Sequence, residues 1–160
     1  MDNMSDEKVT FEQVLQEHGV LVCPFIGVSM QPMLRQKRDT VIIVPAENRL
    51  RRGDIAMYRY PSGKYVMHRV IRVRENDYVI RGDNLYRDEI GITDDMILGV
   101  VTGFIRRGRQ HSVQSLRYRL FGQIWMALYP LRRFLHQLKG FLTEGLWVHL
   151  RLRREARMKK

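Results

Sequence analysis

The stretch GVSMQPML, residues 27–34, decides more about this protein than any other part of its sequence. It sets Ser29 in a short turn, with Gly27 before it and Pro32 after it. A serine hydroxyl is a weak nucleophile at neutral pH and needs a base within hydrogen-bond reach to take its proton. His68 is the natural candidate, because an unperturbed imidazole titrates near neutrality. Most isolated Ser and His pairs never meet in space, so the surrounding sequence decides whether this one has a function.

The surrounding sequence supplies four further stretches in a fixed order. They are RRGDIAMYRY (51–60), VMHRVIRV (66–73), VIRGDNLYRD (79–88) and ILGVVTGFIRRGR (97–109). Together with residues 27–34 they resemble the signal peptidase and LexA-like clan of serine peptidases, whose blocks read GxSMxP, GD-I-V, HRV, GDN and a closing G-x-V strand. The resemblance covers roughly residues 20–107. It is nearest to the histidine-type branch, as in endoplasmic-reticulum and archaeal signal peptidases, since the lysine-type members carry a lysine where His68 stands.

The resemblance implies a role for each residue of a catalytic site. Ser29 would attack a peptide carbonyl, and His68 would act first as general base and then as the acid that protonates the leaving amine. A carboxylate would orient His68 and stabilise its charged form. Asp88 is the preferred candidate because it lies close to where this branch carries its acid, and Asp83 in the GDN stretch is the alternative. A structural turn residue is the competing interpretation of Asp83.

The turn around Ser29 would supply the rest of the site. The backbone N–H of Ser29 is the expected oxyanion donor. Many bacterial signal peptidases add a hydroxyl two residues before the nucleophile, but Gly27 occupies that position here. Met30 and Pro32 are expected to shape the turn and the wall of the substrate-binding pocket. Lys64, four residues before His68, is a less favoured alternative base.

The pattern between the motifs predicts a mainly β fold. Short β-rich runs at 40–44, 54–60, 65–74, 78–80 and 97–105 are separated by Gly, Pro and Asn turn residues. These features predict a curled antiparallel sheet or partial barrel, in agreement with the signal-peptidase/LexA-like architecture. Residues 10–18 predict a short helix that Thr10 caps, with Gln13 at the capping-box position.

The charge is distributed unevenly along the chain. Residues 1–105 hold 14 Lys and Arg against 15 Asp and Glu, a net of −1, whereas residues 106–160 hold 14 against 2, a net of +12. Such asymmetry points to a partner of opposite sign for the C-terminal part. Leucines and isoleucines at helical spacing from Leu116 to Leu142, interrupted at Pro130, predict an amphipathic helical tail that lies in a membrane interface. The basic end, RLRREARMKK (151–160), would attract anionic lipids.

These observations predict three segments. They are an N-terminal helix segment at 1–19, a catalytic domain at 20–109 and a basic helical tail at 110–160. The single Cys23 excludes an internal disulfide, and the five histidines lack metal-ligand spacing, so neither a metal nor another cofactor is expected. The N-terminus lacks the charged and then apolar pattern of a signal peptide, which favours a cytoplasmic bacterial protein held peripherally at the inner membrane.

The function expected from the sequence is a serine endopeptidase that cleaves a peptide or protein substrate. Two alternatives belong to other classes. The same cleft could bind an extended peptide without cutting it, or the tail could make the protein a membrane-surface adaptor. Nucleic acid is not the expected partner, because no nucleic-acid motif accompanies the charge. Packing of the tail on the β domain or on a second subunit stays open.

Overall fold

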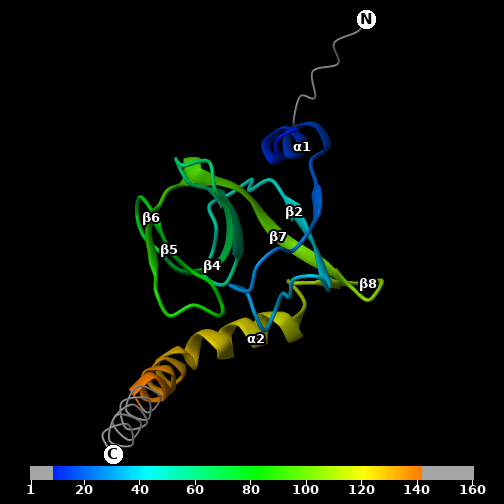
Figure 1. Cartoon of the computed structure of the whole chain (residues 1–160). Helices are drawn as coiled ribbons and strands as arrows, with labels where there is room; N and C mark the ends of the chain where they lie inside the picture. The colour runs from blue at the N-terminus through cyan, green and yellow to red at the C-terminus, as the bar shows by residue number, and fades with distance from the viewer. Residues whose placement is uncertain (1–8, 142–160) are drawn as a thin grey trace, which may run out of the picture. The chain divides into compact units, whose positions relative to one another are not determined.

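The computed structural model describes residues 9–141, and these form an open antiparallel sheet followed by two helical segments. The strands are β1 (Leu21–Pro24), β2 (Asp39–Val44), β3 (Ile55–Arg59), β4 (Tyr65–Val73), β5 (Tyr78–Arg81), β6 (Glu89–Ile92), β7 (Ile97–Arg106) and β8 (Arg109–Ser112). Their order across the sheet is β1-β2-β7-β3-β4-β5-β6, with β8 paired to β7. The sheet curls, so that β4, β5 and β6 lie on one side of Figure 1 and β2, β7 and β8 on the other.

The predicted mainly β architecture is confirmed at this level. Five strands coincide with the runs expected from the sequence, because β-branched and aromatic residues there are flanked by turn residues. The sequence pattern missed β1, β6 and β8. β6 contains Gly91, and β8 reads RQHS, so neither has the alternating apolar pattern that marks a half-buried strand. Pairing with a neighbouring strand, rather than local propensity, makes these segments extended.

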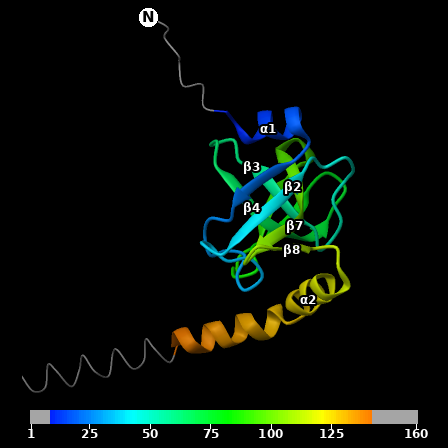
Figure 2. The ribbon, with the colours of Figure 1, turned by 90° about the vertical axis from the view of Figure 1, so that its right-hand side faces the viewer.

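Helix α1 (Phe11–His18) begins with the predicted capping box. The Thr10 side chain accepts from Gln13 N, and the Gln13 side chain accepts from Thr10 N at 2.7 Å. The helix ends at Gly19, whose left-handed φ of 67° is readily accessible to glycine. Figure 2 shows α1 at one end of the sheet. The Phe11 ring meets Tyr65 of β4 edge to face at 4.9 Å, which ties the helix to the sheet.

The sheet buries apolar side chains on both faces, and β4 shows the alternation. Tyr65 and Met67 pack against a cluster that includes Met30, whereas Val66 and Val70 belong with a second cluster. The first cluster contains Leu15, Leu21, Phe25, Met30, Met33, Leu34, Val41, Ile43, Ile55, Met57, Val101 and Phe104. The second contains Leu50, Ala56, Tyr58, Val70, Tyr78, Ile80 and Ile92. Consecutive residues of β4 therefore face different surroundings.

The boundary expected between 109 and 110 lies further along the chain. Contacts divide the chain into one unit that ends at Gln123 and a second that begins at Ile124. The reason is packing: β8 completes the sheet beside β7, and the Tyr118 ring in helix α2 (Leu116–Ala127) meets Phe104 edge to face at 5.2 Å. The first turns of the expected tail therefore belong to the β unit.

The predicted interruption near Pro130 is present. α2 ends at Ala127, Leu128 is a turn, and residues 129–141 are again helical. A proline has no N–H to donate and its ring clashes with the preceding turn, so it is tolerated only at the start of a helix. The predicted stripe reaches Leu142, and that residue, with the basic end 151–160, lies outside the described residues.

Candidate functional site

The loop between β1 and β2, residues 25–38, carries Ser29 and is called the serine loop here. Ser29 begins a tight turn in which Gln31 N donates to Val28 O at 3.2 Å. The Gln31–Pro32 peptide bond is cis. Gly27 adopts a φ of 103°, a backbone conformation that residues with side chains rarely adopt, so the backbone at this position favours glycine.

Two arginines from other strands hold the serine loop through Met33. Arg106 at the end of β7 donates to Met33 O at 2.6 Å and to both carboxylate oxygens of Asp39 at 2.7 Å. Arg69 on β4 lies 2.9 Å from Met33 Sδ. Burial by itself raises the pKa of Asp39, and hydrogen bonds from Arg106 and Arg35 N lower it overall. The loop is therefore anchored to the sheet by buried charged groups rather than by its own turn alone.

The main chain of Ser29 lies against the turn that follows β5. Asn84 N donates to Ser29 O at 2.7 Å. A Cβ added to Gly82 would come within 2.7 Å of the same oxygen, so glycine is required there for steric reasons. β5 pairs with β4 in a register that sets Arg81 opposite Arg69. The turn after β5 therefore contacts Ser29, and β5 itself pairs with β4, the strand that carries His68.

His68 lies on β4 in a buried polar cluster, with 5% of its surface exposed. Its Nδ1 lies 2.8 Å from Glu89 Oε1 and 3.2 Å from the Tyr58 hydroxyl. Donation from Nδ1–H to Glu89 would leave Nε2 as the acceptor. Within residues 9–141, every fully buried side-chain N or O has a partner, and no hydrogen bond reaches Nε2. Nε2 is therefore the ring nitrogen that forms no hydrogen bond with the described residues, on a side chain that is 7% exposed.

Glu89, at the start of β6, accepts hydrogen bonds from three side chains. Besides His68, both Tyr58 and Tyr60 donate their hydroxyl protons to Oε2. Burial by itself raises the pKa of Glu89, but these three hydrogen bonds outweigh it and lower the pKa to about 2. Burial and the bond to Glu89 raise the pKa of Tyr58 and of Tyr60. Glu89 is therefore ionised at neutral pH and faces the imidazole.

Neither aspartate proposed from the sequence is the carboxylate beside His68. Asp88 accepts from Arg81 at 2.8 Å, and Asp83 forms a bidentate pair with Arg69 at 2.8 and 2.6 Å. The structure brings Glu89 to His68 instead. Asp88 and Glu89 are adjacent in the chain, and neighbouring positions at the start of a strand point different ways, so a one-residue shift changes which carboxylate meets the ring.

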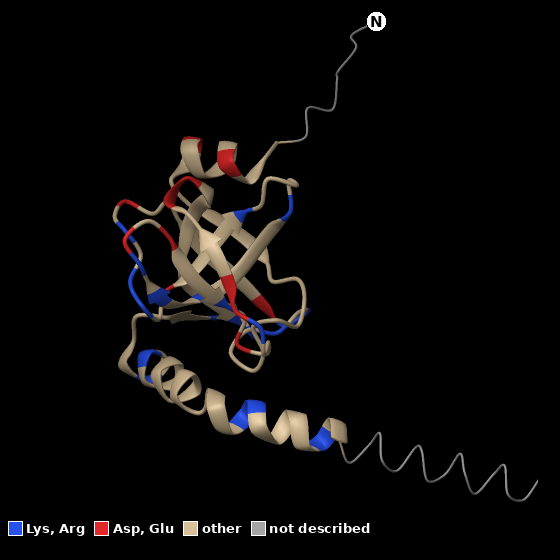
Figure 3. Cartoon of the chain, turned by 90° about the vertical axis from the view of Figure 1, so that its left-hand side faces the viewer, with Lys and Arg blue, Asp and Glu red and all other residues tan. Residues whose placement is uncertain are grey.

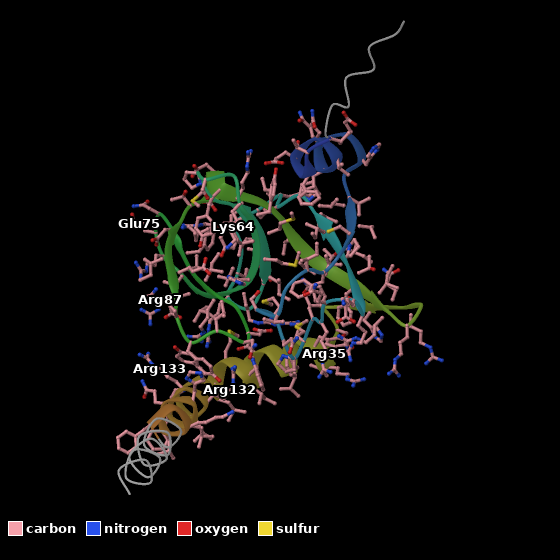
Figure 4. The ribbon with its side chains drawn as sticks, in the orientation of Figure 1. Arg35, Lys64, Glu75, Arg87, Arg132 and Arg133 are labelled. Atoms are coloured by element: carbon pink, nitrogen blue, oxygen red, sulfur yellow. The ribbon has the colours of Figure 1, made fainter. Side chains whose placement is uncertain are left out.

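The other expected site residues divide between core and surface. Met30 is fully buried in the first cluster, so it packs the core and cannot line a substrate surface. Pro32 is half-buried and lines a pocket of about 170 Å³ together with Met33, Arg106, Arg117, Tyr118 and Phe121. Lys64 is exposed on the β3–β4 hairpin, and Figure 4 shows it well apart from Arg35 of the serine loop. No hydrogen bond or ion pair joins Lys64 to Ser29 within the described residues.

Ser29 and His68 are not joined by a hydrogen bond in the part of the chain that the structure describes. Tyr65, Met67 and Arg69 lie on the face of β4 that meets the cluster of Met30 and Met33 in the serine loop, whereas His68 alternates with them and lies with Val66 and Val70 on the other face. No hydrogen bond within residues 9–141 engages the Ser29 N–H either, so this donor is available to an oxyanion.

The described residues contain no group of three His, Cys, Asp or Glu side chains arranged to hold a metal ion. The groups described above are the Ser29 hydroxyl and N–H and the His68 imidazole, which Glu89 orients. Searches for similar proteins identify no family model, no curated protein and no solved structure that matches this chain.

Replacing Glu89 by glutamine should remove a pH-dependent part of the stability. The folded-state pKa of about 2 lies below the ordinary value of 4.5, so the stabilisation is present above about pH 4.5 and is lost as the pH falls toward 2. A shift of this size corresponds to about 3 kcal/mol. Urea unfolding at pH 6 and at pH 2.5 should give a large difference between wild type and Glu89→Gln at pH 6 and a small one at pH 2.5. Glu47→Gln, at an exposed carboxylate, is the control. If wild type and Glu89→Gln differed in free energy of unfolding by the same amount at both pH values, ionisation of Glu89 would not be the source of the stabilisation.

Proposed function

We propose that this protein is a serine endopeptidase with a signal-peptidase/LexA-like fold, in which Ser29 is the nucleophile and His68 the general base. The observation that carries the proposal is the contact between His68 Nδ1 and the ionised Glu89, which orients the ring and leaves Nε2 to accept a proton. A buried imidazole held by a carboxylate is the arrangement that activates hydroxyl nucleophiles. The order of the five sequence motifs supports the same assignment.

The reaction begins when Ser29 Oγ attacks the carbonyl carbon of an extended peptide and its proton passes to His68 Nε2. The oxyanion that forms accepts a hydrogen bond from the Ser29 N–H. When the C–N bond breaks, Nε2–H protonates the departing amine. Water then attacks the acyl-enzyme, gives its proton to Nε2 and releases the carboxylic acid product together with the restored Ser29 hydroxyl. Glu89 remains ionised throughout and stabilises the imidazolium.

A fluorophosphonate probe tests this assignment without knowledge of the substrate. Intact-mass spectrometry of the full chain should give one adduct, located on Ser29 by peptide mapping. Ser29→Ala should abolish the adduct, and His68→Ala should slow its formation roughly 100-fold or more, as expected when a general base is lost. Ser62→Ala, on the exposed β3–β4 turn, is the matched control and should label like wild type. Equal labelling of wild type and Ser29→Ala would refute the nucleophile.

A peptide-binding module without catalysis is the second candidate. The absence of a hydrogen bond between Ser29 and His68 in the described structure favours it. β1 is an edge strand, and Val22 on it together with Ile26 and Val28 in the serine loop is exposed. An edge of this kind can accept an extended peptide by strand addition. A wild-type protein that stays unlabelled but binds extended peptides would identify this function.

A further inference from the structure

The second unit presents apolar side chains at helical spacing to its surroundings. From Ile124 to Phe141 these side chains recur at intervals of three or four residues, apart from the adjacent Phe134 and Leu135, with exposed fractions from 42% to 77%. They are Ile124, Leu128, Leu131, Phe134, Leu135, Leu138 and Phe141. At 3.6 residues per turn they share one side of the helix, about 140° wide. We call these seven residues the apolar stripe.

The same segment carries only positive charge. Arg132, Arg133 and Lys139 lie between the members of the apolar stripe, and the sequence has no Asp or Glu from residue 97 to residue 143. Figure 3 shows blue stretches and no red ones along the ribbon of these helical segments, whereas both colours occur on the sheet. Figure 4 labels Arg132 and Arg133 there. The Arg132 guanidinium lies 3.8 Å from the centroid of the Trp125 ring, an arrangement that places a cation beside an amphipathic aromatic.

No helix among the described residues is long and apolar enough to cross a bilayer. A helix with an apolar face, cationic flanks and an aromatic at their border has the composition of helices that lie in the plane of a membrane interface. A second copy of the stripe fits less well. Paired helices of this kind usually flank their seam with charges of both signs, whereas two copies of this surface would bring cations together without a carboxylate.

We propose that the apolar stripe docks on the surface of an anionic lipid bilayer. The stripe enters the boundary between headgroups and acyl chains, and the three cations contact lipid phosphates. This inference concerns residues 124–141 and is independent of the peptidase assignment.

Co-sedimentation of the full chain with vesicles tests the proposal. Vesicles of 70% phosphatidylcholine and 30% phosphatidylglycerol should bind the protein, and pure phosphatidylcholine vesicles should bind it much less. Arg133→Gln with Lys139→Gln should lower the partition coefficient about 30-fold, since each cation near such a surface contributes about fivefold. Leu131→Gln with Leu138→Gln, which leaves the charge unchanged, should lower it roughly 100-fold because two apolar side chains no longer gain from burial.

The control is Gln123→Asn with Gln137→Asn, at exposed polar positions, which should bind as wild type does. Circular dichroism of each variant checks that the helix content is kept. A wild type that does not sediment with anionic vesicles would overturn the proposal. So would leucine variants that bind as tightly as the control. If the leucine variants instead turn a lipid-free dimer into a monomer in sedimentation equilibrium, the stripe binds a second copy of the chain and the proposal is also overturned.

Discussion

Ser29→Ala is expected to reduce peptide cleavage by roughly 10⁴-fold or more while the protein stays folded. His68→Ala should cost nearly as much, because nucleophile and base act as a unit and loss of either stops the same step. Glu89→Gln should cost less than either, since the neutral amide still contacts the ring but no longer stabilises its positive charge. The measurement is kcat/KM on a peptide substrate found by screening a library with the wild-type protein.

Asp88→Asn separates this mechanism from the one predicted from the sequence. Asp88 pairs with Arg81 in the structure, so its replacement should leave kcat nearly unchanged. The double variant Ser29→Ala/His68→Ala should be no worse than Ser29→Ala alone. If Asp88→Asn lowered kcat/KM more than Glu89→Gln does, Asp88 rather than Glu89 would be the residue that orients His68. Cleavage by purified Ser29→Ala at the wild-type rate would show that Ser29 is not the nucleophile.

Asp83→Asn is expected to lower the free energy of unfolding by about 3–5 kcal/mol, the cost of leaving a buried charge without its partner. The side chains of Asp83 and Arg69 are only 2% and 3% exposed, and they form two hydrogen bonds with each other. Arg69 also donates to Gly53 O at 2.9 Å, so the pair joins the turn before β3 to the turn after β5. Urea denaturation monitored by circular dichroism gives the measurement.

Glu12→Gln is the matched control for this loss. Glu12 pairs with Arg59 at 3.1 Å near the surface, with side chains 31% and 48% exposed, so its contribution should be about 0–1 kcal/mol. Both variants remove one negative charge from an arginine pair, but the Asp83 pair is buried, whereas Glu12 is partly exposed and also accepts from the Tyr65 hydroxyl. A cost for Asp83→Asn as small as that for Glu12→Gln would show that the buried pair does not hold these turns together.

The β-rich runs and the turn residues between them were sufficient to predict the mainly β class of fold, while the motif order made Ser29 and His68 candidates. These features are local: turn residues bound each run, and a capping box such as Thr10 with Gln13 is complete within four residues. The kink before Pro130 was predictable for the same reason, because the missing N–H belongs to the proline itself.

Tertiary structure alone decided which groups surround these residues. Glu89 lies 21 positions after His68, and only the pairing of β4 with β5 and of β5 with β6, including a register shift in each, brings its carboxylate to Nδ1. Likewise, the sequence predicted that Met30 lines a pocket, but Met30 is fully buried among the apolar side chains of the first cluster. A shift of one residue in a strand moves every side chain to the other face, so strand register, which sequence spacing alone does not fix, decides which carboxylate lies beside His68.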